Sequence, residues 1–81
     1  MLIPVKMLCV VSTDGRLEPV RFKLWVEDEG NVTIHVDRIM GYRADALGIN
    51  VICGAVLRDM RRRFTLRYNL KDHAWKLVDM V

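Results

Sequence analysis

Apolar side chains recur at every second position over most of this chain, and this period constrains the fold more than any other feature of the sequence. Successive side chains of a β-strand point to opposite faces, so a period of two is typical of a strand with one buried and one exposed face. The alternation is clearest at Phe64, Leu66, Tyr68 and Leu70, and no run of ten or more residues has helical spacing. The sequence therefore predicts an all-β protein.

Six segments are predicted to form strands. They are residues 3–11, 20–26, 32–36 with a possible extension to 40, 49–57, 64–70 and 75–80. In the second segment, Val20 and Phe22 begin the apolar face, while Trp25 lies on the polar face. Because proline donates no backbone hydrogen bond, Pro19 predicts that this strand begins its pairing late or lies at an edge there.

Turn residues separate the predicted strands. Asp14-Gly15 predicts a type I′ hairpin turn, which needs positive φ at both central residues. Polar residues at 27–31, 58–61 and 71–73 predict further turns, and residues 41–48 lack alternation and predict a loop or a single helical turn.

Short strands with turns every eight to twelve residues are typical of an all-β sandwich or barrel. The chain has 81 residues, 52% of them hydrophobic, which is enough for one small domain over 1–81. An open sheet of this size would leave one apolar face wet and two edges unpaired. We therefore expect a single small antiparallel barrel, or a strongly curled meander, of about six strands.

The two cysteines, Cys9 and Cys53, each lie in an apolar run, where a free thiol behaves as a small hydrophobic side chain. Small secreted domains usually carry four or more cysteines. We therefore expect reduced core cysteines, with a mutual disulfide or a reactive thiol as the alternatives. No apolar run is long enough for a signal peptide or a membrane span, so we expect a cytoplasmic protein with no membrane partner.

Sequence motifs of metal, nucleotide and nucleophilic chemistry are missing. The cysteines and histidines are at least 18 positions apart, and no glycine-rich phosphate loop is present. Ser12, the only serine, lies in no nucleophile motif. The sequence therefore predicts no catalytic residue, no metal and no cofactor. If the protein were an enzyme, its candidate residues would be Cys9, Cys53, His35 and Asp37.

Positive charge gathers in the second half of the chain. Residues 1–40 carry five basic and six acidic side chains, whereas residues 41–81 carry eight basic and four acidic ones. If the apolar residues of segment 64–70 point inward, Arg63 and Arg67 line the outer face. Guanidinium groups suit phosphate, and a basic barrel face can follow a nucleic-acid backbone. The candidate residues for an anionic partner such as RNA or DNA are Arg58, Arg61, Arg62, Arg63 and Arg67.

Two aromatic residues, Trp25 and Tyr42, are candidates for base stacking or for an interface. Arg21 and Lys23 flank Trp25 on the same predicted face, and Arg43 follows Tyr42. The alternative for the arginines is a solvated strand face, because β proteins place charges on exposed strands to prevent edge-to-edge pairing. An acidic protein partner would also suit them.

Four packing patterns carry a resemblance to a known class of domains. They are Phe22-x-Leu24-Trp25, Ile34-x-Val36-Asp37-Arg38-Ile39, Phe64-x-Leu66-x-Tyr68 and Trp75-x-Leu77. With them the chain resembles the small uncharacterised all-β domains of bacteria over about positions 20–77. The resemblance implies the fold and supplies no activity or site.

We therefore expect a small non-enzymatic β-barrel that binds a partner, with RNA or DNA as the leading candidate. The alternative is a protein-interaction domain, or a structural domain that forms a homo-oligomer such as a homodimer through an edge strand.

Overall fold

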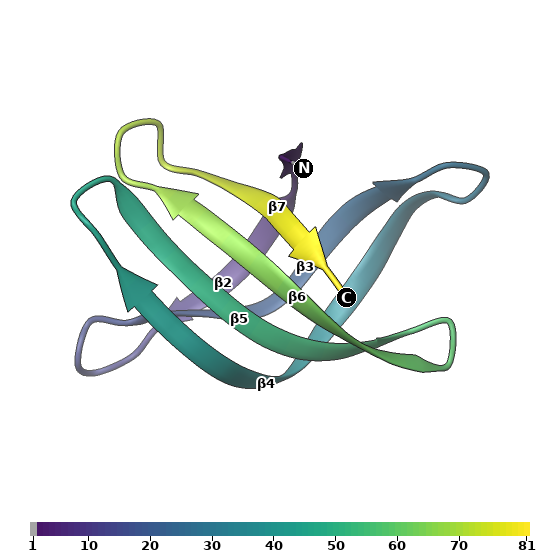
Figure 1. Ribbon diagram of the computed structural model, residues 1–81, viewed down its shortest axis with the longest axis horizontal. Coiled ribbons are helices and arrows are strands. Elements are labelled where there is room, and N and C mark those ends of the chain that lie inside the picture. The colour runs from purple at the N-terminus through teal and green to yellow at the C-terminus, as the bar shows by residue number, and fades with distance from the viewer. Residues whose placement is uncertain (1) are drawn as a thin grey trace.

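The computed structural model describes residues 2–81, which form seven antiparallel strands without a helix; Met1, the first residue of the predicted 1–81 domain, lies outside that range. The strands are β1 (Ile3–Pro4), β2 (Lys6–Val11), β3 (Leu17–Val26), β4 (Gly30–Ala44), β5 (Gly48–Leu57), β6 (Met60–Asn69) and β7 (Ala74–Met80). They form one sheet in the order β1-β7-β6-β5-β4-β3-β2 (Figure 1). The predicted all-β, strongly curled architecture is confirmed. The structure has seven strands because Val5 divides the first predicted strand.

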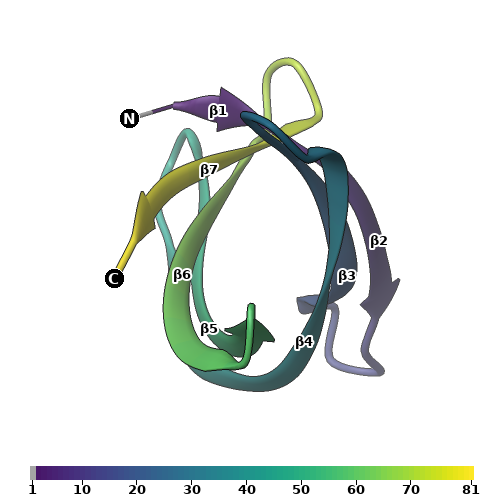
Figure 2. The same ribbon diagram turned by 90° about the vertical axis from the view of Figure 1, so that its right-hand side faces the viewer.

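The N-terminal segment joins the two ends of this sheet. β1 pairs with β7, the Val5 N–H donates to the carbonyl of Trp75 at 3.2 Å, and β2 then pairs with β3. Since β1 and β2 are the end strands of the sheet and follow each other in the chain, the sheet curls into a partly closed barrel, seen end-on in Figure 2.

The long strand β4 carries much of the curl. Its first half pairs with β3 and its second half with β5. The β4–β5 register shifts at Asp37 and at Met40, each of which is an extra residue, and such bulges bend a strand. The predicted loop or helical turn at 41–48 is wrong over its first half, since the strand continues to Ala44. The two bulges put residues 38 and 39 out of phase with the rest of the strand, which interrupts the alternation in the sequence.

The interior is filled by the alternating side chains of β3 to β7. Phe64 and Leu66 are fully buried and Tyr68 packs against them, as predicted for this strand. Phe22 and Phe64 meet edge to face with ring centroids 5.5 Å apart, a favoured aromatic geometry. The buried apolar residues are Phe22, Leu24, Ile34, Val51, Cys53, Ala55, Phe64, Leu66, Trp75 and Leu77. Cys53 belongs to this core, whereas Cys9 packs against it from a partly buried position, and both are free thiols.

A bulge in β3 changes which residues of its first half face the core. Leu8 pairs with Arg21 and Cys9 with Pro19, so Val20 between them is the extra residue. Val20 consequently turns outward, with 38% of its surface exposed, and Pro19 is buried. The predicted inward position of Val20 is therefore wrong. The predicted edge position of Pro19 is confirmed, because the pairing of β3 with β4 begins only at Arg21.

The turns lie close to the predicted positions, but the first differs in geometry. Gly15 has a positive φ of 89°, whereas Asp14 does not, and the Gly15 N–H donates to the Ser12 carbonyl at 2.9 Å. The predicted type I′ turn at Asp14-Gly15 is therefore wrong. Positive φ at two successive residues occurs instead in the two-residue β5–β6 turn, with 52° at Arg58 and 63° at Asp59.

Leu70 does not continue the apolar face of β6. It lies in the turn that joins β6 to β7, where its N–H donates to the Leu47 carbonyl at 3.0 Å and its side chain is exposed. The predicted inward position of Leu70 is therefore wrong, because the strand ends one residue earlier, at Asn69.

Candidate nucleic-acid interface

The outer face of β4, β5 and β6 carries three rows of side chains that run across the strands. Residues directly opposite in an antiparallel ladder project from the same face and lie next to each other. The middle row is Gly41, Ile52 and Thr65. The row on one side is Arg38, Gly54 and Arg63, and the row on the other is Arg43, Asn50 and Arg67, which Lys76 of β7 extends.

The middle row is the floor of a hollow of about 430 Å³, which we call the groove; its lining residues are Gly41, Tyr42, Arg43, Asn50, Ile52 and Thr65. Gly41 contributes no side chain, and Ile52 fills the space above it: a Cβ placed on Gly41 would lie 3.4 Å from Ile52 Cδ1. The floor therefore combines an apolar surface with the hydroxyl of Thr65, while both flanking rows carry cations.

Three exposed arginines of the flanking rows, Arg38, Arg43 and Arg63, form no ion pair with an acidic side chain of residues 2–81. The ion pairs formed within residues 2–81 involve Arg16, Arg58, Arg61 and Arg67 instead. An arginine without a carboxylate partner keeps its donors available for phosphate oxygens. The groove is therefore bordered by three cations without an ion-pair partner among the described residues, while Asp45 offsets the charge of Arg67 and the Asp37 carboxylate lies over Gly54 in the other row.

The five arginines predicted to meet an anionic partner are used in different ways. Arg58 binds Glu29 at 2.7 Å and Arg61 binds Asp37 at 2.9 Å, so neither charge is free. Arg62 faces away from the groove, and its Nε donates to the Val81 carbonyl at 3.3 Å. Two of the five, Arg63 and Arg67, thus lie in the rows that flank the groove, and neither lines the hollow itself.

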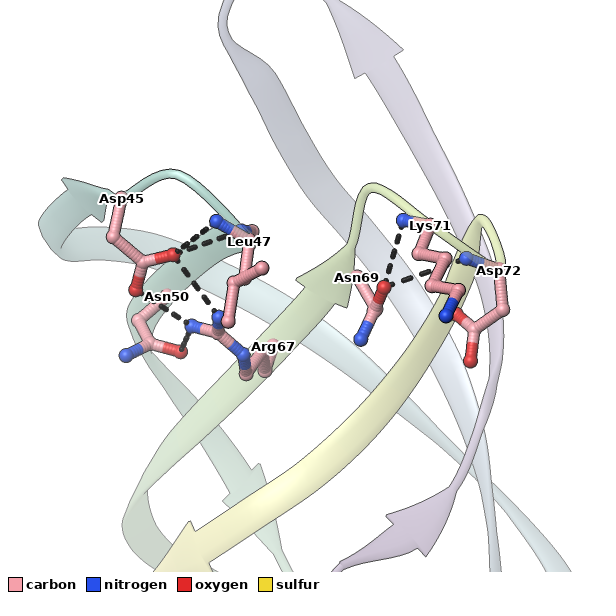
Figure 3. Close-up of polar contacts among 8 residues, drawn as sticks. Asp45, Leu47, Asn50, Arg67, Asn69, Lys71 and Asp72 are labelled. Atoms are coloured by element: carbon pink, nitrogen blue, oxygen red, sulfur yellow. Dashed lines mark hydrogen bonds and ion pairs between the residues drawn. The ribbon is translucent and has the colours of Figure 1, made fainter.

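Arg67 is held in place by the β4–β5 turn (Figure 3). Its Nη2 donates to Asp45 Oδ1 at 3.1 Å, and its Nη1 donates to Asn50 Oδ1 at 3.0 Å. Asp45 Oδ1 also accepts the N–H groups of Leu47 and Gly48, both at 2.8 Å. The hydrogen bond from Arg67, followed by that from the Leu47 amide, lowers the pKa of Asp45 to about 2. Arg67 is therefore held in place beside the groove, and its charge is offset by Asp45.

Neither aromatic candidate lies exposed in the groove. Tyr42 pairs with the buried Val51 and packs against the core, and the Arg16 guanidinium lies 4.9 Å from the centre of its ring. The ring is therefore already occupied by a cation of the protein itself. Trp25 is 67% exposed, but it belongs to β3 and pairs with Asn31, on another part of the barrel.

Sequence reasoning missed the contribution of β4 and β5 to the groove. Asn50 and Ile52 could have been found from the outward register of segment 49–57. Arg38 could not, because the bulge at Asp37 turns it outward against the alternation that precedes it. Arg43 keeps the outward register, since the second bulge at Met40 restores the phase, but it lies in the segment that the sequence predicted to be a loop.

No protein-family model, curated protein or solved structure matches this chain, which is consistent with the resemblance to domains without an assigned activity. Within residues 2–81 there is no helix long and apolar enough to cross a membrane. Across the same described range, no three Cys, His, Asp or Glu side chains gather closely enough to hold a metal ion.

Proposed function

We propose that this protein is a non-enzymatic module that binds single-stranded RNA or DNA in the groove across β4, β5 and β6. The observation that carries the proposal is the pair of cationic rows, in which Arg38, Arg43 and Arg63 have no acidic partner among the described residues. Two free thiols suit a reducing compartment, so the proposed location is the cytoplasm.

The spacing of the rows favours a single strand over a duplex. Arg63 and Arg67 mark the two flanking rows on β6 and are four residues apart, which corresponds to about 13 Å along a strand. A single nucleotide chain can enter a groove of this width with phosphates on its borders, whereas a duplex would rest on the rim. Asp79 of β7 pairs with Thr65 and places a negative charge at the end of the floor.

The composition of the groove predicts recognition of the phosphate backbone with little preference for base sequence. Its floor offers Ile52 and Thr65 for contact with bases, but no exposed aromatic ring among its lining residues for stacking. Phosphate contacts give affinity that depends on salt and carry no sequence information directly.

Fluorescence anisotropy with a labelled, mixed-sequence single-stranded 12-mer tests the proposal. We expect saturable binding at low salt and weaker binding of the same sequence as a duplex. If three arginines each neutralise one phosphate, the logarithm of the association constant falls with the logarithm of salt concentration with a slope of about −2. Absence of binding at high micromolar protein in low salt would refute the proposal.

Two neighbouring arginines offer a matched pair of variants. Arg63→Gln removes a cation from the groove, so we expect weaker binding of the 12-mer and a salt slope smaller in magnitude by about 0.7. Arg62→Gln makes the same change of charge one residue away on the opposite face of β6. We expect it to bind as the unmodified protein does. An equal loss in the two variants would show that net charge, and not the groove, governs binding.

A further inference from the structure

The second strand leaves one backbone edge of the sheet open. Among the described residues, β2 pairs with β3 on one side and with no strand on the other. The preceding strand, β1, does not cover this edge, because it pairs with β7. An edge strand presents a row of unpaired N–H and C=O groups, which is a template for another strand. The edge is six residues long, from Lys6 to Val11.

This edge is apolar where it meets solvent. Leu8 and Val10 alternate on its outer face and are 47% and 50% exposed, and the bulged Val20 of β3 adds to them. Natural sheets usually protect such an edge with charges or cover it. Here the middle of the strand carries neither a charge nor a proline, so its side chains leave the edge accessible to pairing.

The start of the same edge is strongly basic. Lys6 pairs directly with Lys23, and Arg21 lies beside them opposite Leu8. A hollow of about 260 Å³ is lined by Lys6, Met7, Leu8, Arg21, Phe22, Lys23 and Thr33. Like charges placed opposite each other destabilise a sheet. None of these three cations takes part in an ion pair within residues 2–81.

We propose that the open edge of β2 binds an extended acidic segment of another protein as an added β-strand. Addition of a strand to a sheet edge gains affinity from backbone hydrogen bonds and specificity from alternate side chains. The added strand would place a carboxylate beside the Lys6–Lys23 pair and apolar side chains beside Leu8 and Val10. The partner segment is therefore one with apolar residues at every second position and an acidic residue at the end that meets Lys6.

Charge complementarity favours this partner over a second copy of the same chain. Lys6 is the only charged residue of β2, so a second β2 brings no carboxylate to the basic end of the edge. The surface is also separate from the proposed nucleic-acid groove, since β2 and β3 lie across the barrel from β5 and β6 (Figure 2).

Two labelled peptides test the proposal by anisotropy: Glu-Thr-Val-Thr-Val-Thr and the same peptide with Lys in place of Glu. We expect the unmodified protein to prefer the Glu peptide. The Lys6→Glu/Lys23→Glu variant should reverse this preference and lose about fivefold in affinity for the Glu peptide, the effect of one exposed ion pair. A control variant, Arg62→Glu/Lys71→Glu, makes the same change of charge on other strands and turns and should retain the preference.

Amide hydrogen exchange locates the binding site. Saturation with the Glu peptide should slow exchange in residues 6–11 and leave β5 and β6 unchanged. Lys6→Gln is a milder second variant, which should reduce the preference in the same direction if the double variant does not fold. Equal binding of both peptides, an equal loss in the control variant, or protection outside β2 would each overturn the proposal. So would a dimer in sedimentation whose β2 amides are protected without peptide.

Discussion

The β5–β6 hairpin and the β2–β3 hairpin differ in the regularity of their pairing and in how completely their inward side chains are buried. β5 and β6 pair over ten consecutive positions without a register shift, and the inward side chains of both strands are fully buried at their centre. β2 and β3 pair across a bulge, and the inward residues Met7 and Cys9 are only partly buried. The β5–β6 hairpin therefore lies at the centre of the sheet, and the β2–β3 hairpin lies at its margin.

The two hairpins also differ in whether their basic side chains form ion pairs. Three arginines of the β5–β6 hairpin, Arg58, Arg61 and Arg67, bind carboxylates of other segments. The cations of the β2–β3 ladder, Lys6, Arg21 and Lys23, form no ion pair in residues 2–81. The number of basic residues in a segment is thus a poor guide to how much charge it offers a partner.

The largest expected effect tests the difference in burial between the two hairpins. Phe64→Ala removes a side chain with no exposed surface and should lower the free energy of unfolding by about 3–5 kcal/mol. Met7→Ala, at the partly buried margin, should cost about 1 kcal/mol. Urea denaturation measures both. Similar losses in the two variants would remove the distinction between centre and margin.

The next effect concerns the close approach of β5 to β6. A Cβ on Gly48 would lie 2.3 Å from the Tyr68 carbonyl oxygen, so Gly48→Ala must move the backbone and should cost about 1–3 kcal/mol. Gly41→Ala is the control, because its nearest neighbour is a movable side-chain atom of Ile52 at 3.4 Å. Thermal unfolding followed by circular dichroism should give a clearly lower Tm for Gly48→Ala than for Gly41→Ala. The reverse order would contradict this close approach of the two strands.

A smaller effect concerns the contact between Asp45 and Arg67. The pKa of the Asp45 carboxyl is lowered to about 2, so NMR titration of this group should give a midpoint near that pH. Because the folded pKa lies below the unfolded one, the charge of Asp45 stabilises the fold at neutral pH, and this contribution is lost as the pH falls through about 2. Arg67→Gln should raise the midpoint toward 3.8. A midpoint already near 3.8 in the unmodified protein would mean that Arg67 is not held.

The last effect concerns thiol reactivity and not stability. It compares Cys53 of the β5–β6 hairpin with Cys9 of the β2–β3 hairpin. Burial, followed by the negative charge of Asp37, raises the pKa of Cys53 to about 11, and burial also raises the pKa of the less enclosed Cys9. Since the thiolate is the reactive form, Cys53 should resist a chromogenic disulfide reagent at pH 8 until the protein unfolds, while Cys9 reacts first. Cys9→Ser should abolish the early reaction. A fast reaction that persists in that variant would place Cys53 at the surface.

The fold was largely predictable, and the exceptions have a common cause. The alternation correctly identified the buried face of β6 and most of β3 and β5. It failed for Val20 and for residues 38 and 39 of β4, because a bulge inserts one residue and reverses the side chains that follow it. In β4 the second bulge restores the original phase. The bulge at Asp37 hid Arg38 and the predicted loop at 41–48 hid Arg43, so the β4 border of the candidate groove could not be found from the sequence.

The sequence by itself determined that the chain is all-β and which side chains of its regular strands face the interior. These properties are local, since the pleat of the backbone sends neighbouring residues to opposite faces. Only the tertiary structure decided which cations remain unpaired. Arg61 meets Asp37 across 24 positions and Arg67 meets Asp45 across 22, and such distances are closed by strand order and bulges that no local pattern encodes.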